Sequence, residues 1–298
     1  MKKNISKKCP VCSKRGEFIF ESSNNHFVYN CLNKNCGHFW VPEYTKDQLL
    51  FEREENLENE SNNRLRVWGK RNKKLLNLIL KKISFKKEYK FLDFGSGCAH
   101  ISRTFKRELG EKVKIFCIDS NKKCKKFYPK WGLIPIEDIK QIQEKIDFIY
   151  LIEVIEHLEN PQNILCNLKG MLSDNGVILI STPPGYHNEN YTNAYSEKTH
   201  IHFFTNRSLN VLLEKVGLKK IEFKYYPEFY PSVNYAKNFF LFSKNQIKNL
   251  ITFKFSRKQF LATFYEYFLE NRDYRIKMQN KLTYPYHLIG FTKIKSID

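Results

Sequence analysis

The stretch FLDFGSGCA, residues 91–99, decides the fold of this chain. An apolar strand ends near the acid Asp93, and Gly95 and Gly97 let the backbone turn sharply beside a ligand. The helix that follows would point its first backbone N–H groups at that turn. A second acid, Asp119, ends the next apolar run roughly 20 residues on, where an acid can accept hydrogen bonds from both hydroxyls of a ribose. The stretch therefore predicts a nucleoside-binding turn at the end of a strand.

Strand and helix patterns alternate from residue 89 onward. Short apolar runs predict strands and amphipathic runs predict helices, one of which opens with Pro161 in its first turn. We expect strands at residues 90–94, 113–118, 133–135, 146–152, 176–180, 219–225 and 286–293, and helices at 99–109, 161–172 and 208–216. Such alternation is typical of an α/β fold with a doubly wound, mostly parallel sheet.

The remaining sequence divides into an N-terminal module, a linker and an insertion. Residues 1–44 hold four cysteines, and residues 45–88 are polar with a helical pattern. Residues 89–298 form the predicted α/β domain, in which residues 226–283 are rich in Phe, Tyr and Lys and are interpreted as a helical cap. Residues 64–90 carry eleven Lys or Arg and one acid. That basic face is predicted to be solvated or to contact a substrate anion.

The four N-terminal cysteines have the spacing of a metal site. Cys9 and Cys12 form one pair, Cys31 and Cys36 form the second, and short alternating runs between them predict a hairpin. Four thiolates at this spacing suit a tetrahedral, structural Zn²⁺ and leave no open position for catalysis. His38 is an alternative ligand, although the all-cysteine site is the simpler prediction. The module is therefore interpreted as a zinc ribbon.

The glycine turn resembles the cofactor motif of one enzyme family. A dinucleotide-binding turn would carry its third glycine at position 100, which is His100 here. FLDFGSG followed by FCID is instead similar to the S-adenosylmethionine (SAM) motifs of class I SAM-dependent methyltransferases, with Ala99 in place of a common third glycine. The resemblance implies a Rossmann-like, seven-stranded sheet and SAM as cofactor.

The same resemblance assigns roles to individual residues around the cofactor. Gly95 and Gly97 would contact the methionine part, and Asp93 would hold the loop. Asp119 would bind the ribose. Glu137 or Asp138, after the next strand, would lie near the adenine. Glu153, after the strand that follows, would also contact the cofactor.

A second group of acids and histidines is predicted on the acceptor side. The strand DFIYLIEVIEH ends in Glu153, Glu156 and His157, and the segment THIHFF brings His200 and His202. In an open α/β sheet the ligand crevice lies beyond the carboxyl ends of the strands, so these side chains would line it. Carboxylates and imidazoles together can bind a divalent metal or supply a general base.

This second group resembles the metal site of two O-methyltransferase groups, those of small-RNA 3′ ends and of the ubiquinone pathway. By that resemblance Mg²⁺ would be held by Glu153, Glu156, His157 and His202. Many methyltransferases share the pattern without a metal. In that case His157 is the first choice of general base and His202 the second.

The composition of the chain favours anionic partners, and the sequence also predicts its location in the cell. The net charge of +20, from 51 Lys+Arg against 31 Asp+Glu, would favour RNA or an anionic membrane surface, although a biased genome base composition also produces Lys-rich chains. The absence of a signal-peptide pattern and of a long apolar run predicts a cytoplasmic protein.

Three functions follow from these patterns. The leading hypothesis is O-methylation of a small molecule or of a glycan or lipid-linked intermediate. The first alternative is an RNA methyltransferase that uses the ribbon and the basic surface. The second alternative is a non-enzymatic SAM-binding or zinc-mediated interaction protein. The oligomeric state is left open.

Overall fold

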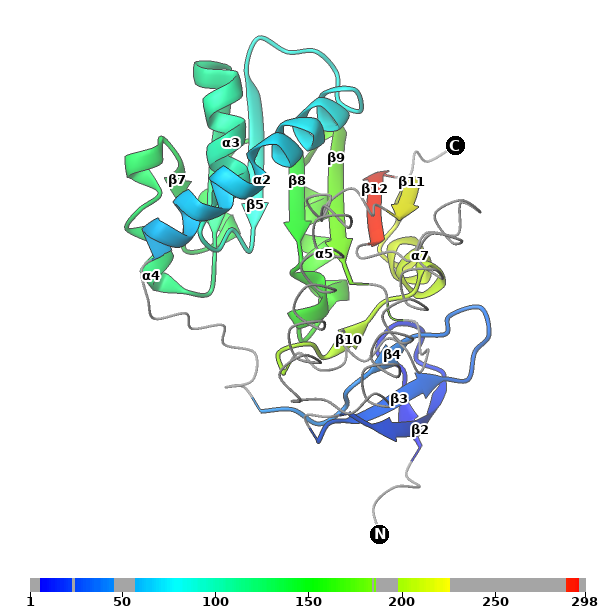
Figure 1. Cartoon of the computed structure of the whole chain (residues 1–298). Helices are drawn as coiled ribbons and strands as arrows, with labels where there is room; N and C mark the ends of the chain where they lie inside the picture. The colour runs from blue at the N-terminus through cyan, green and yellow to red at the C-terminus, as the bar shows by residue number, and fades with distance from the viewer. Residues whose placement is uncertain are drawn as a thin grey trace, which may run out of the picture. The chain divides into compact units, whose positions relative to one another are not determined.

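The computed structural model describes residues 6–22, 25–45, 57–183, 185, 198–225 and 288–294. The described strands form one seven-stranded and one five-stranded sheet (Figure 1). The chain divides into two units, Met1–Lys224 with His287–Asp298, and Tyr225–Tyr286. The predicted cap at 226–283 lies outside the described residues, and so does the first part of the predicted linker, residues 46–56.

The larger sheet confirms the predicted fold class. Its strand order is β11-β12-β9-β8-β5-β6-β7. Pairing is parallel between β9, β8, β5, β6 and β7, and β12 is antiparallel to β9. The strands are β5 (Tyr89–Phe94), β6 (Val113–Ile118), β7 (Ile134–Pro135), β8 (Ile146–Ile152), β9 (Leu172–Thr182), β11 (Leu218–Tyr225) and β12 (Leu288–Ile294).

The predicted helices are also present. They are α2 (Leu57–Leu80) in the predicted linker, α3 (His100–Leu109), α5 (Pro161–Met171) and α7 (Asn206–Lys215). The short α4 (Lys122–Lys125) was not predicted. The start of α5 is fixed by Asn160, whose side chain accepts a hydrogen bond from Asn163 N, with Pro161 in the first turn. Helix α2 packs on α3, and α5 contacts α7 and β9. Helices therefore pack beside the apolar strands of the sheet.

The central strands position the functional edge of the sheet. Strand β5 lies between β8 and β6, so the chain leaves β5 at the point where the strand order reverses. Phe91, Phe148 and Tyr150 are fully buried, and the rings of the first two lie 5.4 Å apart edge to face. Because both faces of these strands are buried, their polar side chains gather at the two ends. Ligands in such sheets bind beyond the carboxyl ends, at the reversal point.

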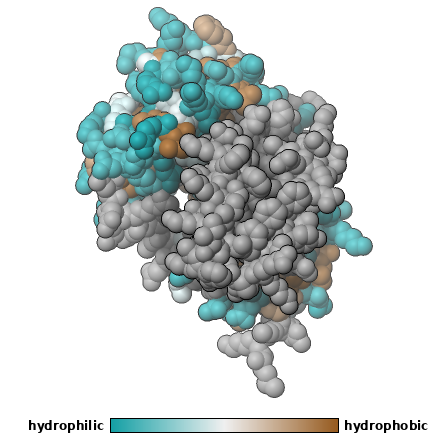
Figure 2. Space-filling model, viewed as in Figure 1, coloured by the Kyte–Doolittle hydropathy of each residue, from teal (hydrophilic) through white to brown (hydrophobic). Residues whose placement is uncertain are grey.

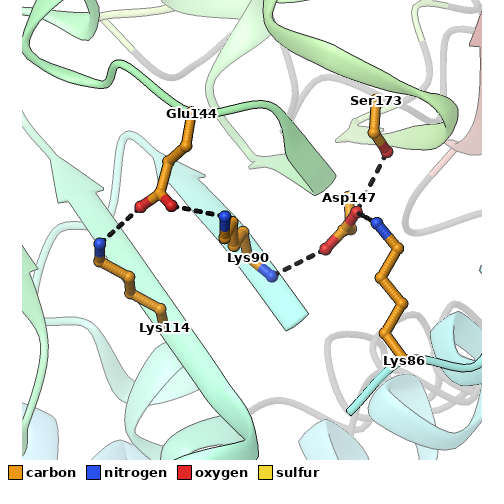
Figure 3. Close-up of polar contacts among 6 residues, drawn as sticks. All are labelled: Lys86, Lys90, Lys114, Glu144, Asp147 and Ser173. Carbon is orange, nitrogen blue, oxygen red and sulfur yellow. Dashed lines mark hydrogen bonds and ion pairs between the residues drawn. The ribbon is translucent and has the colours of Figure 1, made fainter. Parts of the chain in front are cut away.

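The amino end of the sheet is closed by ion pairs (Figure 3). Asp147, whose side chain is 6% exposed, opens β8 and pairs with Lys86. Its Oδ2 accepts a hydrogen bond from Lys90 N at 2.9 Å, and its Oδ1 accepts one from Ser173 Oγ at 3.1 Å. One carboxylate thus ties the starts of β5, β8 and β9 together.

A second carboxylate supports the same end. Glu144 accepts one Nζ contact from Lys90 and one from Lys114, each at 2.5 Å. Figure 3 shows the two lysines reaching it from neighbouring strands. These pairs lower the pKa of Glu144, the Lys114 hydrogen bond more than that of Lys90. Three lysines and two carboxylates therefore connect the strands at the amino end of the sheet.

The five-stranded sheet has the order β1-β2-β3-β4-β10. Four of its strands belong to the N-terminal module, and the β2–β3 pair confirms the predicted hairpin. The fifth, β10, comes from the segment between β9 and α7. Its addition to this sheet was not predicted. The strands are β1 (Lys7–Lys8), β2 (Arg15–Glu21), β3 (Phe27–Cys31), β4 (Phe39–Trp40) and β10 (His202–Phe203).

The described surface is polar around α2 and α3. Figure 2 shows mainly hydrophilic residues over the part of the molecule where these helices lie. Phe85, which is 92% exposed, is among the few large apolar side chains on the described surface. None of the described helices is both long enough and apolar enough to cross a bilayer.

Candidate functional site

The glycine turn after β5 has a backbone that favours glycine. Gly95 has φ +79°, and a Cβ there would lie 2.4 Å from Val154 Cγ2. Gly97 has φ +48°, with open space where a Cβ would point. Ala99, which caps α3, also adopts a left-handed conformation, with φ 51°. The turn therefore offers a concave backbone cradle at the N-terminus of a ten-residue helix, which suits an anionic or polar ligand group.

Asp119 lies against this turn, as the sequence predicted. Its Oδ2 accepts a hydrogen bond from Gly97 N at 2.6 Å, and its Oδ1 accepts one from Asn121 N at 2.8 Å. The side chain is half-buried, and each carboxylate oxygen keeps a lone pair beyond these contacts. It can therefore hold the turn and still accept hydrogen bonds from vicinal hydroxyls.

Asp93 faces the interior of the sheet. It is 4% exposed, and Ser102 Oγ donates a hydrogen bond to it. The same Ser102 oxygen lies 2.5 Å from Tyr150 Oη. Burial raises the pKa of Asp93 to about 7, the Ser102 hydrogen bond opposes that rise, and the charge of Asp119 adds to it. Asp93 thus joins β5 to the first turn of α3.

Glu137 and Asp138 follow β7 at the same edge of the sheet. Both side chains are exposed. Glu137 pairs with Lys125, and the Asp138 carboxylate accepts a hydrogen bond from Lys140 N at 2.8 Å in a capping box completed by Gln141. Their carboxylates are therefore both engaged in local contacts.

A positive cluster beside the turn was not recognised in the sequence. Burial, followed by the charges of Arg64, Arg71 and Arg103, lowers the pKa of His100 to about 3. Arg64 and Arg71 come from α2, and Arg103 comes from α3. The basic run of residues 64–90, predicted to be solvated or to contact a substrate anion, contains Arg64 and Arg71 but gave no sign of their position beside Arg103.

Glu153 lies at the end of β8 with a left-handed backbone. Its φ is 57°, an uncommon value for a residue other than glycine. Its amide donates to Ser181 O at 2.9 Å, and its Oε1 accepts a hydrogen bond from Ser181 Oγ at 2.5 Å. The strained conformation is thereby held by β9, and strain of this kind gathers at functional sites.

Glu156, His157 and His200 come together one turn further on. One potential ligand atom from each lies within 4.8 Å of the others. The rings of the two histidines are 4.8 Å apart. His157 Nδ1 lies 2.9 Å from the Thr199 carbonyl oxygen, so Nδ1 carries the proton and Nε2 carries the lone pair. The group is referred to below as the Glu–His group.

The Glu156 carboxyl is unusual within this group. It is 1% exposed, and neither of its oxygens has a hydrogen-bond partner among the described residues. The Thr182 hydroxyl lies near it but outside hydrogen-bonding geometry. Burial, and then the charge of Glu153, raise the pKa of Glu156 well above its ordinary value. A buried carboxyl without a partner is costly, and it is typical of a site that binds something.

The structure places His202 elsewhere. The sequence analysis put His202 with the two acids and His157, whereas His200 takes that place. His202 is buried, and its Nδ1 lies 3.0 Å from Nε2 of His38. Burial lowers the pKa of His202 to about 4, with the Leu158 backbone opposing the shift. Residues two apart in a strand share a face, so the different surroundings of the two histidines reflect that β10 begins only at His202, after a turn at Lys198 and Thr199.

The four cysteines converge in the N-terminal module. One sulfur from each of Cys9, Cys12, Cys31 and Cys36 lies within 4.8 Å of the others, and all four are free thiols. The Cys9–Cys36 and Cys12–Cys31 sulfurs are 3.9 Å and 3.3 Å apart. A tetrahedral zinc with bonds near 2.3 Å would need sulfurs about 3.8 Å apart. The donor set and its spacing therefore fit Zn²⁺.

Comparison with known proteins identifies the class. A family model described as a methyltransferase domain matches residues 63–222, more than half of the chain. A structure of the Haloferax volcanii Trm112 methyltransferase activator with a methyltransferase is 10% identical, with a TM-score of 0.52 over 82% of this chain and 100% of that one. A SAM-dependent methyltransferase from Aquifex aeolicus is 16% identical, with a TM-score of 0.42 over 57% of this chain and 92% of that one. No curated protein sequence matches.

The sheet, the glycine turn and the family match define a class I SAM-dependent methyltransferase. The chain belongs to the methyltransferase domain family, and its activity is methyl transfer from SAM. The predicted fold, enzyme class and cofactor are thus confirmed. The roles of the individual site residues stay predictions.

Proposed function

We propose that this methyltransferase methylates a hydroxyl oxygen of a small molecule, a glycan or a lipid-linked intermediate, and that the Glu–His group activates this hydroxyl. The observation that carries the proposal is the buried Glu156 carboxyl, which has no hydrogen-bond partner among the described residues and lies beside two imidazoles. A bound cation or a substrate hydroxyl would satisfy it. The group follows β8, at the edge where the cofactor turn lies.

A divalent cation fits the donors of this group. One carboxylate and two imidazoles can bind Mn²⁺, Fe²⁺ or Zn²⁺, and Mg²⁺ accepts the carboxylate with water. The lone pair on His157 Nε2 is fixed by the Thr199 carbonyl, and such an outer contact orients a metal-binding histidine. The cation would lower the proton affinity of the acceptor hydroxyl. In this arrangement His200 replaces the His202 of the sequence-based ligand set, and Glu153 is the second acid nearby.

Without a cation, the same residues support general-base chemistry. The acceptor oxygen would form a bond to the methyl carbon as the carbon–sulfur bond breaks, and the hydroxyl proton would pass to His157 Nε2. A sulfonium methyl donor is already activated, so alignment of the acceptor supplies most of the acceleration. Glu156 would then accept a hydrogen bond from the acceptor or from His200. His157 is therefore the first choice of base.

Cofactor binding is proposed for the turn on the other side of the crevice. The backbone at Gly95 and Gly97 would cradle the methionine part, and Asp119 would accept hydrogen bonds from the ribose. Asp93 would hold the turn from behind. The positive cluster of Arg64, Arg71 and Arg103 would favour the methionine carboxylate. Additional contacts are proposed at Glu153 and at the turn of Glu137 and Asp138.

Zinc is proposed for the four cysteines, with a structural role. Cys9, Cys12, Cys31 and Cys36 supply four sulfur ligands, which fill a tetrahedral site and leave no position for substrate. The hairpin and its knuckles are too small to rely on an apolar core alone. Metal binding would therefore contribute directly to the folding of the module.

RNA is the alternative acceptor that a specific observation favours. The basic residues of α2 lie on the hydrophilic surface of Figure 2, and a polyanion would bind there. An anionic membrane surface would be attracted by the same charge. The test below therefore includes RNA as an acceptor.

The experiment uses purified full-length protein. S-adenosylhomocysteine (SAH) binding is measured by calorimetry, and Mn²⁺ binding by electron paramagnetic resonance. Methyl transfer from tritiated SAM is measured with catechols, methyl glycosides, polyprenyl-phosphate sugars and total RNA as acceptors. We expect SAH and Mn²⁺ to bind, and label to enter a hydroxyl compound.

Two variants separate the outcomes. Glu156→Gln should keep SAH binding and lose Mn²⁺ binding, whereas Glu159→Gln, an exposed acid on the same segment, should leave both unchanged. Label found only in RNA would overturn the small-molecule proposal. Transfer that survives both metal removal and Glu156→Gln at full rate would exclude the Glu–His group.

A further inference from the structure

The N-terminal module and the acceptor side share one β-sheet. Strand β10 is antiparallel to β4, with His202 opposite Trp40 and Phe203 opposite Phe39. The segment that supplies β10 also carries His200, two residues earlier. A member of the Glu–His group therefore lies just before a strand that, among the described strands, pairs with the edge of the cysteine module.

Ile201 connects the two parts through its backbone. Its N–H donates to the Glu156 carbonyl oxygen at 3.0 Å, and its carbonyl oxygen accepts from Val41 N at 2.9 Å. The peptide groups on either side of Ile201 thus bind the Glu156 turn and the cysteine module. His200 is the next residue, so its position depends on both bonds.

A buried histidine pair adds a side-chain connection. His38 is fully buried, with its Nε2 3.0 Å from His202 Nδ1 and its Nδ1 3.4 Å from Ser208 Oγ. The His38 ring lies 4.8 Å from that of Phe204 and is stacked on Trp40. Ser208 belongs to the capping box that begins α7. One imidazole of the module therefore joins β10 to the helix that follows it.

The cysteine knuckle itself is bonded to the same helix start. Thr205 Oγ1 donates to Cys36 O at 3.4 Å, and Arg207 Nη1 donates to Lys34 O at 2.8 Å. Within the knuckle, the amides of Cys36 and Gly37 both donate to Asn33 O. The loop that would hold zinc is therefore fixed to residues that immediately follow the histidine segment.

We propose that the cysteine module is a positioning part of the acceptor site and that His38 is its positioning residue. Metal bound to the four cysteines fixes the Asn33–His38 knuckle, which fixes β10 and so aligns His200 with Glu156 and His157. The proposal rests on the function assigned above to the Glu–His group. The cofactor turn is held by other bonds, such as Gly95 N to Ile118 O at 2.8 Å, so the two halves of the site should respond differently.

The experiment compares three substitutions in the full-length protein. His38→Ala removes the imidazole pair, and His38→Gln keeps an N–H donor at the position of Nε2. Ile19→Ala, at a 44% exposed position in β2, is the matched control in the same module. Zinc content, SAH affinity, Mn²⁺ affinity, hydrogen exchange at Ile201 and methyl transfer are measured for each.

We expect His38→Ala to keep one zinc and to bind SAH within about threefold of the unchanged protein, while kcat falls by about 10²-fold or more, as for a misplaced catalytic group. Exchange at the Ile201 amide should accelerate and Mn²⁺ affinity should fall. His38→Gln should recover most of the protection of the Ile201 amide and most of the Mn²⁺ affinity. Ile19→Ala should change neither quantity. Chelation of zinc from the unchanged protein should reproduce the His38→Ala pattern.

Two results would overturn the inference. One is unchanged Ile201 exchange and unchanged kcat in His38→Ala. The other is an equal loss of SAH binding and catalysis both in His38→Ala and in Arg207→Ala, a milder change at an exposed position, because the two halves of the site then respond together. The proposed function fails separately, if the unchanged protein binds no SAH or if Glu156→Gln leaves methyl transfer at full rate after metal removal. In that case, hydrogen exchange at the Ile201 amide still tests whether the cysteine module is coupled to the Glu156 turn.

Discussion

Two carboxyls are buried near opposite ends of β8, and they differ in their hydrogen-bond partners. Asp147, at the amino end, has Lys86, the Lys90 amide and Ser173 as partners. Glu156, just past the carboxyl end, is more deeply buried and has no hydrogen-bond partner among the described residues. The two lie nine positions apart on one segment, so sequence distance and burial do not explain the difference.

The difference separates stability from function within one strand. A carboxylate that is paired and hydrogen-bonded holds the strands together, and losing one partner of such a buried pair is strongly destabilising. A carboxyl that is buried without partners destabilises the fold and is retained where it binds something. We therefore expect substitutions at the two ends to have opposite signs in stability and unequal effects on catalysis.

The largest expected effect is on catalysis at the carboxyl end. Glu156→Gln should lower methyl transfer by about 10² to 10³-fold, because the acceptor hydroxyl loses its cation or its hydrogen-bond acceptor. The midpoint of thermal unfolding should stay equal or rise, since an unpaired acid is replaced by a neutral group of the same shape. Steady-state assays beside thermal unfolding would check this. A large fall in the midpoint would show that Glu156 is a structural residue.

The next effect is on stability at the amino end. Asp147→Ala should lower the free energy of unfolding by about 2–3 kcal/mol, because Lys86 and two hydrogen-bond donors lose their common acceptor. The kcat of the folded enzyme should stay within about twofold. Urea unfolding and kinetics at low temperature measure the two quantities. An equal loss of kcat would contradict the separation of roles.

The pH dependence of stability should also differ in sign between the two ends. Burial raises the pKa of Asp93 to about 7, so its folded form binds a proton that the unfolded chain releases near pH 4. Its contribution is therefore present at pH 4 and is lost as the pH rises toward 7. Lys114 and Lys90 lower the pKa of Glu144, so its contribution is present above pH 4.5 and is lost as the pH falls.

The measurement is urea unfolding of the unchanged protein, Asp93→Asn and Glu144→Gln between pH 3.5 and 8. The stability of the unchanged protein relative to Asp93→Asn should fall by about 4 kcal/mol over that range. The stability of the unchanged protein relative to Glu144→Gln should rise between pH 3.5 and pH 5. Parallel curves for all three proteins would rule out both assignments.

The smallest expected effect concerns backbone strain at the carboxyl edge. Ala99 has φ 51°, a conformation that costs a residue with a Cβ about 1 kcal/mol relative to glycine. Ala99→Gly should therefore raise the free energy of unfolding by about 0.5–1 kcal/mol, with SAH affinity unchanged. Ser13→Gly, which relieves a similar conformation in the cysteine module, is the matched comparison. A destabilised Ala99→Gly would show that other contacts hold this turn.

The sequence correctly predicted those parts of the fold that a local residue pattern determines. The strands 113–118 and 146–152 were predicted with the bounds that the structure has, because buried parallel strands are continuous apolar runs. The glycine turn and Asp119 were predicted to lie together because carboxyl ends of adjacent parallel strands meet. Pairs at short spacing likewise predicted the convergence of the four cysteines.

What sequence reasoning missed depends on contacts between distant segments. The structure groups His200 with Glu156 and His157, whereas His202 lies in the pairing of β10 with β4, which no local pattern specifies. The positive cluster around His100 depends on the packing of α2 on α3. The basic run alone is compatible with a solvated face.

The pairing of β4 with β10, and the contact between His38 and His202 beside it, also affect the order of folding. The two histidines of the pair are 164 residues apart, so the module emerges from the ribosome long before its fifth strand is made. During that interval β4 is an unpaired edge, which is open to incorrect association. Contacts of such long range form late. We therefore expect docking of β10 to be a late step in maturation, after zinc has been acquired, and zinc-starved cells should accumulate a methyltransferase whose sheet domain is folded but inactive.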